Sequence, residues 1–106
     1  LRAELRELDM SLAFDDFGAG QARLTELVEV HPEYLKFDMS LIRSIDQAPK
    51  DKVQMVRSLV HMAADLGIIP LAEGVETQGE RDACVDIGFQ LGQGYLFGKP
   101  VPIKVR

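Results

Sequence analysis

Four short apolar runs recur along the chain, each followed by polar or glycine-rich residues. They lie at residues 11–14, 34–38, 68–72 and 89–93. Runs of this length are typical of β-strands buried in a sheet. Pro70 lies inside the third run, and a proline is compatible with a strand only near its beginning or at an edge. The pattern therefore predicts four strands.

Longer stretches with apolar residues at helical spacing separate these runs. They predict helices over residues 1–10, 21–30, 51–66 and 78–87, with a short helical turn at residues 40–45. Pro32 disfavours helical geometry in His31, so the second helix is expected to end there. Gly67 and Gly88 follow the last two helices, where a left-handed cap is common. Thr77 and Glu80 have the spacing of a capping box.

The order is strand then helix, repeated four times. This order predicts right-handed crossovers between parallel strands. A complete (β/α)8 barrel needs about 250 residues, whereas the chain has 106. We therefore predict an α/β fold of four strand–helix units that corresponds to half of a TIM-like barrel.

The amino-acid composition and the net charge argue against several classes of function. Hydrophobic residues make up 46% and charged residues 27%, as in an ordinary globular domain. The net charge of -5 and the absence of a Lys/Arg run argue against binding to a DNA or RNA duplex. No apolar run approaches the roughly 20 residues of a membrane helix, and there is no signal-peptide core. The single cysteine, Cys84, excludes an internal disulfide and fits a reducing compartment, so we expect a cytoplasmic location.

Polar residues are concentrated where the predicted strands end. These residues are Asp15, Asp16, Lys36, Asp38, Glu73 and Gln93. In parallel α/β folds the carboxyl edge of the sheet carries the chemistry. The adjacent carboxylates of Asp15 and Asp16 would repel each other, and a divalent cation such as Mg²⁺ or Mn²⁺ would remove that cost. A solvated pair in an Asx turn before Gly18 is the alternative interpretation, and the spacing leaves both open.

The remaining candidates also allow two interpretations. A lysine in an apolar strand needs an anionic partner, so Lys36 either contacts a phosphoryl group or its water, or forms a structural ion pair. Glu73 is a candidate metal ligand or general base. Glu76 either holds the glycine-rich turn or favours the next helix, and a structural role is preferred. Gln93 either contacts a ligand or is a hydrogen-bonded rim residue.

The strand ends lie within four segments, which read LAFDDFGAG, YLKFDMSLI, LAEGVET and QGYLFGKP. Taken in this order, they resemble the C-terminal half of EAL-domain proteins over residues 10–102. The resemblance implies the C-terminal half of a (β/α)8 TIM-like barrel, with residues 1–106 forming a partial EAL domain. It also implies a bacterial signalling hydrolase that cleaves one phosphodiester of cyclic di-GMP with two Mg²⁺ or Mn²⁺ ions.

The resemblance also implies a role for each matching residue. Asp15 and Asp16 would be metal ligands, and Asp38 would lie in the same active-site set. Lys36 would contact the hydrolytic water, and Glu73 would be the base or a second-metal ligand. Two further residues have accessory roles: Gln93 would line the substrate site and Glu76 would hold the glycine-rich loop.

The chain also departs from the family pattern. The Glu-Ala-Leu signature is absent, together with an asparagine and a glutamate that ligate the first metal from N-terminal strands. Ala19 and Gln21 replace a threonine and a tyrosine, and Met39 replaces a common arginine. We therefore expect hydrolysis from a longer parent protein and little from this chain alone. Two alternatives remain: a non-catalytic module that binds cyclic di-GMP or a signalling partner, and a half-barrel that forms a homodimer.

Overall fold

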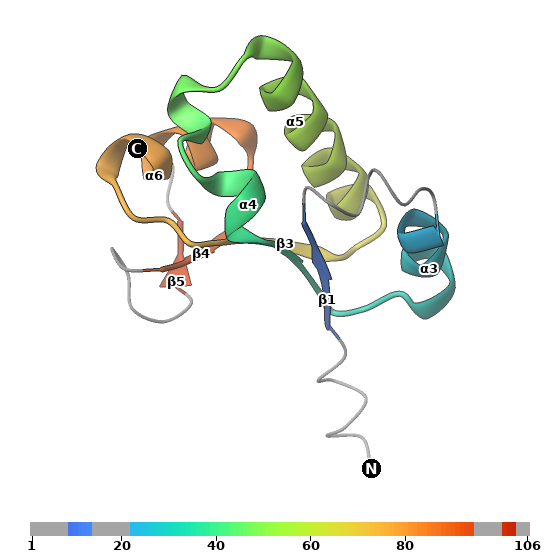
Figure 1. The fold of residues 1–106 in the computed structure, drawn as a ribbon. Coiled ribbons are helices and arrows are strands. Elements are labelled where there is room, and N and C mark those ends of the chain that lie inside the picture. The colour runs from blue at the N-terminus through green and yellow to red at the C-terminus, as the bar shows by residue number, and fades with distance from the viewer. Residues whose placement is uncertain (1–8, 14–21, 95–100, 104–106) are drawn as a thin grey trace.

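The helices cover one face of a five-stranded sheet (Figure 1). This computed structural model describes residues 9–13, 22–94 and 101–103. The strands are β1 (Asp9–Leu12), β2 (Tyr34–Phe37), β3 (Ile69–Glu73), β4 (Leu91–Gln93) and β5 (Val101–Pro102). The helices are α3 (Ala22–Val30), α4 (Met39–Ile42), α5 (Lys50–Asp65) and α6 (Gln78–Ile87), with a 3-10 turn η1 (Ile45–Gln47).

The strands lie in the sheet in the order in which they occur in the sequence. Strands β1 to β4 pair in parallel, and β5 runs antiparallel to β4. Helices α3, α5 and α6 each lie between two successive parallel strands along the chain. The predicted α/β fold with parallel strands and crossover helices is therefore confirmed.

Several boundaries differ from the prediction. Residues 9 and 10 belong to β1 rather than to the helix expected over residues 1–10, because they pair with Tyr34 and Leu35 of β2. The second strand ends at Phe37 and the fourth begins only at Leu91. Strand β5 was not predicted. It is only two residues long, too short for a periodic pattern, and its pairing with β4 defines it.

Alternation along the strands directs one set of side chains toward the helices. Leu35 and Phe37 of β2 are fully buried, whereas Tyr34 and Lys36 between them are half-buried. Alternate side chains in a strand point to opposite faces. The face toward the helices therefore forms the core, and Lys36 lies on the other face. Within the core the rings of Phe37 and Phe89 meet edge to face, with centroids 4.8 Å apart.

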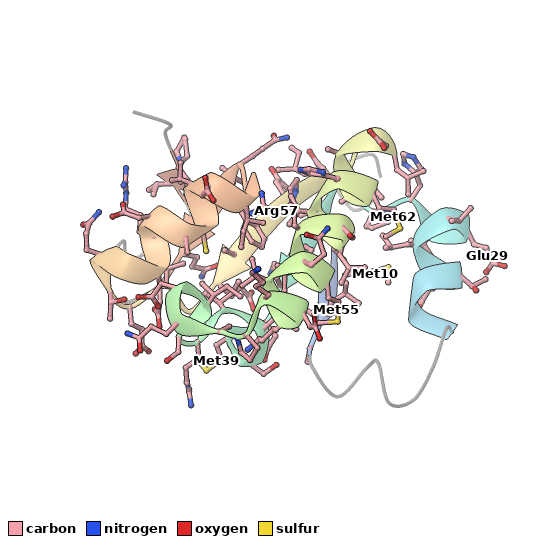
Figure 2. The ribbon with its side chains drawn as sticks, turned by 90° about the horizontal axis from the view of Figure 1, so that it is seen from above. Met10, Glu29, Met39, Met55, Arg57 and Met62 are labelled. Atoms are coloured by element: carbon pink, nitrogen blue, oxygen red, sulfur yellow. The ribbon has the colours of Figure 1, made fainter. Side chains whose placement is uncertain are left out.

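Helix α5 spans the middle of the helical layer and matches the predicted amphipathic helix closely. Figure 2 shows Met55 and Met62 on its side toward β1 and α3, and Arg57 on the side toward α6. Both methionines pack against the core. A Schellman motif ends the helix: Ile68 N donates to Ala63 O at 2.8 Å and Gly67 N to Ala64 O at 3.0 Å. None of the described helices has both the length and the apolar character needed to cross a bilayer.

Two glycines allow the β3–α6 loop to pack tightly between its neighbours. A Cβ atom on Gly94, which follows β4, would overlap the backbone N and O atoms of Val75. A Cβ atom on Gly74 would overlap Cβ of Met39, at the start of α4. Because both residues also have positive φ angles, 151° for Gly94 and 80° for Gly74, only glycine fits without strain.

We expect Gly94→Ala to lower the free energy of unfolding by about 3 kcal/mol or more, because the overlap is with backbone that cannot rotate away. The matched control is Gly67→Ala, which also has a positive φ, 78°, but meets nothing within 4 Å. That control is expected to cost about 1 kcal/mol from backbone strain alone. Denaturant titration of both variants measures the difference, and equal losses would contradict the close approach at Gly94.

Candidate functional site

Three predicted site residues meet where β2, β3 and β4 end. Glu73 and Gln93 are register partners at the ends of β3 and β4. Lys36 pairs with Leu71, two residues before Glu73 on β3. Since register partners in parallel strands share a face, all three side chains lie on the face away from the helices. The structure thus brings together Lys36, Glu73 and Gln93 at the carboxyl edge of the sheet.

An ion pair joins the strand ends of β2 and β3. Nζ of Lys36 lies 3.9 Å from Oε2 of Glu73, and the two side chains are 32% and 27% exposed. The pair is therefore neither sealed in the core nor fully solvated. A pair this open contributes little to stability. Its partial exposure instead leaves both charged groups accessible to a ligand at the edge of the sheet.

Asp38 occupies a different local environment from the one predicted. It lies beyond the end of β2 and is the N-cap of α4, where its Oδ2 accepts a hydrogen bond from Ser40 N at 2.9 Å. The strand predicted over residues 34–38 therefore ends one residue early, and Asp38 belongs to the start of α4 rather than to the strand. The cap explains the aspartate locally, and a role for Asp38 in the active-site set stays a proposal.

The other predicted site residues are only partly described. Asp15 and Asp16 lie outside the described residues, as does the glycine-rich turn that Glu76 was predicted to hold. Glu76 itself is exposed in the β3–α6 loop, and its backbone N donates to Oε1 of Glu80 at 2.8 Å. Among the described residues, no three His, Cys, Asp or Glu side chains are grouped to hold a metal ion.

Backbone contacts hold the β3–α6 loop against β4. Val75 N donates to Gln93 O at 3.0 Å, so the loop that follows Glu73 is bonded to the residue beside Glu73 in the sheet. The sequence did not predict this bond, because it joins residues from separate strand–helix units. The glycine after Gln93 was the available signal, since glycine often marks a close backbone approach.

The single cysteine is a buried core residue rather than a reactive one. Cys84 lies in α6 and is fully buried. Burial, together with the negative charges of Glu80 and Asp46, raises the pKa of its thiol from 9.0 to about 12. A thiol with so high a pKa is protonated at neutral pH and is a poor nucleophile. Cys84 therefore belongs to the core, as its predicted helical position indicated.

The pKa of Cys84 predicts a loss of stability at alkaline pH. Above pH 9.0 the thiol of the unfolded chain loses its proton while the folded one keeps it, up to a pKa of about 12. Rising pH therefore favours the unfolded state, by about 1.4 kcal/mol per pH unit from this group. We expect Cys84→Ala to show a shallower decline than the parent chain in denaturant titrations at pH 7 and pH 10. Parallel declines would contradict this prediction.

Comparison with known proteins identifies the family. The family model described as "EAL domain" matches residues 1–100. The chain belongs to the EAL domain family. It is 40% identical over 99 residues to the cyclic di-GMP phosphodiesterase PdeF of Escherichia coli, covering 93% of this chain and 13% of that protein. It is 36% identical over 98 residues to the cyclic di-GMP phosphodiesterase RocR of Pseudomonas aeruginosa, covering 92% and 25%.

Solved EAL structures have the same fold. An EAL domain protein from Listeria monocytogenes superposes with a TM-score of 0.72 at 29% identity, covering 89% of this chain and 36% of that one. A manganese and cyclic di-GMP complex of Klebsiella pneumoniae BlrP1 superposes with a TM-score of 0.73 at 36% identity, covering 89% and 23%. This EAL chain therefore spans about a third of the Listeria chain and a smaller share of the other three proteins. The predicted family resemblance and fold class are both confirmed.

The donor chemistry of the EAL site fits a hard divalent cation. Glu73 has a partly exposed carboxylate at the edge of the sheet, and the adjacent carboxylates of Asp15 and Asp16, which follow β1 in the sequence, were predicted as metal ligands. Carboxylate oxygens are the ligands that Mg²⁺ and Mn²⁺ prefer. Ca²⁺ also binds such oxygens, so the donor set by itself selects a class of metal rather than one ion.

Proposed function

We propose that the protein carrying this EAL chain hydrolyses one phosphodiester bond of cyclic di-GMP to the linear dinucleotide, with Mg²⁺ or Mn²⁺ as cofactor. The observation that carries the proposal is the cluster of Lys36, Glu73 and Gln93 at the carboxyl edge of the sheet in a member of the EAL family. The names of the relatives support the same substrate, because PdeF and RocR are cyclic di-GMP phosphodiesterases.

Each side chain has a proposed task in this reaction. The ammonium of Lys36 would orient the attacking water and offset negative charge on the phosphoryl oxygens. The carboxylate of Glu73 would accept the water proton or hold a cation, and its charge keeps Lys36 in place. The amide of Gln93 would hydrogen-bond the substrate beside Glu73. Asp38, which follows the end of β2, would belong to the same active-site set.

The metal ions would be held by Asp15 and Asp16, with Glu73 as a further ligand. When bound, such ions would stabilise negative charge on the phosphate and make a water molecule more acidic. Glu76 would hold the glycine-rich turn that carries the two aspartates. Because the chain has no Glu-Ala-Leu signature and lacks the further ligands expected from N-terminal strands, we propose that it binds metal weakly and does not turn over substrate by itself.

The test is hydrolysis of cyclic di-GMP with Mg²⁺ or Mn²⁺, measured on the 106-residue chain and on the N-terminally extended protein. We expect the extended protein to release the linear dinucleotide and Asp15→Asn to abolish this activity. Robust turnover by the short chain would overturn its proposed inactivity. An extended protein that binds cyclic di-GMP without hydrolysing it would contradict the proposed hydrolase activity and indicate a receptor module. The mass of the short chain in solution tests the remaining alternative, a half-barrel that forms a homodimer.

A further inference from the structure

A buried carboxylate connects two loops beside the candidate site. Glu80, in the first turn of α6, is 6% exposed, and it is the buried charged side chain of the described core. Its Oε1 accepts hydrogen bonds from Glu76 N at 2.8 Å and Thr77 N at 3.3 Å. Its Oε2 accepts one from Ser44 N at 2.8 Å. A charge can be buried only when it is well hydrogen-bonded, and these donors fulfil that condition.

The two oxygens serve different parts of the fold. The bond to Thr77 N belongs to the capping box at the start of α6, in which Thr77 Oγ1 accepts from Glu80 N at 3.0 Å. The bond to Ser44 N joins α6 to the segment after α4, 36 residues earlier in the chain. A helix cap needs only the first of these contacts, so the second requires a separate explanation.

The residue that receives the second contact has an unfavourable backbone conformation. Ser44 has a φ of 55°, in the left-handed region that residues other than glycine rarely adopt. Such a conformation persists when the surrounding structure holds it, and the bond to Glu80 provides such a restraint. The neighbouring η1 turn packs on the same helix start, because a Cβ atom on Gly79 would overlap Asp46 Oδ2.

The connected segments are those that follow the candidate site residues. Ser44 follows α4, which begins directly after Lys36, Phe37 and Asp38. Glu76 and Thr77 lie three and four residues after Glu73. The carboxylate of Glu80 therefore connects the segment after β2 to the segment after β3. The Lys36–Glu73 ion pair spans the same two strand ends.

We propose that Glu80 is a positioning residue, which sets the spacing between the Lys36 and Glu73 side chains by holding Ser44 against the β3–α6 loop. This part of the inference concerns geometry and holds for any ligand at the site. Its consequence for catalysis rests on the proposed function, because it assumes that Lys36 and Glu73 act on cyclic di-GMP.

Glu80→Gln separates the connecting role from the capping role. A glutamine has one acceptor oxygen, which can stay on the side of Glu76 N and Thr77 N while its NH₂ group faces Ser44 N and cannot accept from it. The helix cap is kept and the connection is lost. Thr77→Ala is the matched control, because it removes the cap acceptor for Glu80 N and leaves the bond to Ser44 intact.

The first measurement is NMR of the 106-residue chain, which needs no enzymatic activity. We expect the side-chain signals of Lys36 and Glu73 to shift in Glu80→Gln and to stay in place in Thr77→Ala. Unchanged signals in Glu80→Gln, or equal shifts in both variants, would overturn the proposal. If Glu80→Gln loses its secondary structure, Glu80→Asp is used in its place. This variant keeps the charge but is one methylene too short to reach both loops.

The second measurement is hydrolysis of cyclic di-GMP by the extended protein. Because small displacements of reacting groups cost orders of magnitude in rate, we expect Glu80→Gln to lower kcat about tenfold with little change in KM. Thr77→Ala is expected to keep kcat although it lowers Tm. If kcat and Tm fall together in both variants, the loss of activity reflects a loss of stability, and the proposed positioning role of Glu80 is overturned. A parent protein without activity would overturn the proposed function alone, and the NMR result would still decide the role of Glu80.

Discussion

Glu73→Gln in the N-terminally extended protein is expected to lower kcat for cyclic di-GMP hydrolysis by about 10³-fold or more. Glutamine has nearly the same shape as glutamate but carries no charge. The substitution therefore leaves Lys36 Nζ without the carboxylate that lies 3.9 Å away. It also removes a base and a hard metal ligand from the edge of the sheet. Steady-state kinetics with Mg²⁺ or Mn²⁺ measure the loss.

Asp65→Asn is the control for this change in charge. Asp65 is an exposed carboxylate at the end of α5. The end of α5 leads into the first residue of β3, whereas Glu73 is the last residue of that strand. Asp65 therefore lies toward the opposite end of the strands from Glu73. We expect the kcat of the Asp65→Asn variant to stay within about twofold of the parent value, as is usual for surface changes. Activity of Glu73→Gln near that of Asp65→Asn would remove Glu73 from the catalytic set.

Phe37→Ala is expected to cause the largest loss of stability, about 3–5 kcal/mol in the free energy of unfolding. Phe37 is fully buried, lies between Leu12 and Ala72 in the register of the sheet, and meets Phe89 edge to face at 4.8 Å. Alanine leaves a cavity between the sheet and the helices that these neighbours cannot fill without moving the backbone. Because small domains are only marginally stable, a loss of this size unfolds a large share of the molecules.

Denaturant titration of the 106-residue chain, followed by far-UV circular dichroism, measures this loss. The control is Val28→Ala on α3, because Val28 is apolar but 63% exposed. Its substitution is expected to change the free energy of unfolding by less than about 0.5 kcal/mol. A similar result for the two variants would show that Phe37 is not part of the cooperative core.

Local pattern was enough to predict the elements with strong periodicity and clear end signals. The helix expected over residues 51–66 is observed at Lys50–Asp65, and the capping box of Thr77 and Glu80 starts α6 as predicted. Gly67 and Gly88 both have the positive φ angles expected after a helix. These features depend on residues within one or two helical turns of one another, so the order of residues along the chain contains the necessary information.

The candidate site could be predicted in part. Lys36, Glu73 and Gln93 were identified because parallel strands that alternate with helices bring their carboxyl ends to one edge. The register that places Glu73 beside Gln93, and the 3.9 Å between Lys36 and Glu73, came only from the structure. The environment of Asp38 was not predicted, because one residue of difference in the strand end changed it from a strand face to a helix cap.

The family and the class of fold follow from the chain's own motifs and periodicity, since each records a local requirement for burial, capping or charge. Contacts between segments that are far apart in the sequence produce no such local pattern. The bond from Ser44 N to Glu80 spans 36 residues, Gly94 lies against the backbone of Val75 from another strand–helix unit, and β5 is defined by its pairing with β4 alone. Only the folded chain decides these contacts, because their partners come close in space when the sheet and its helices assemble.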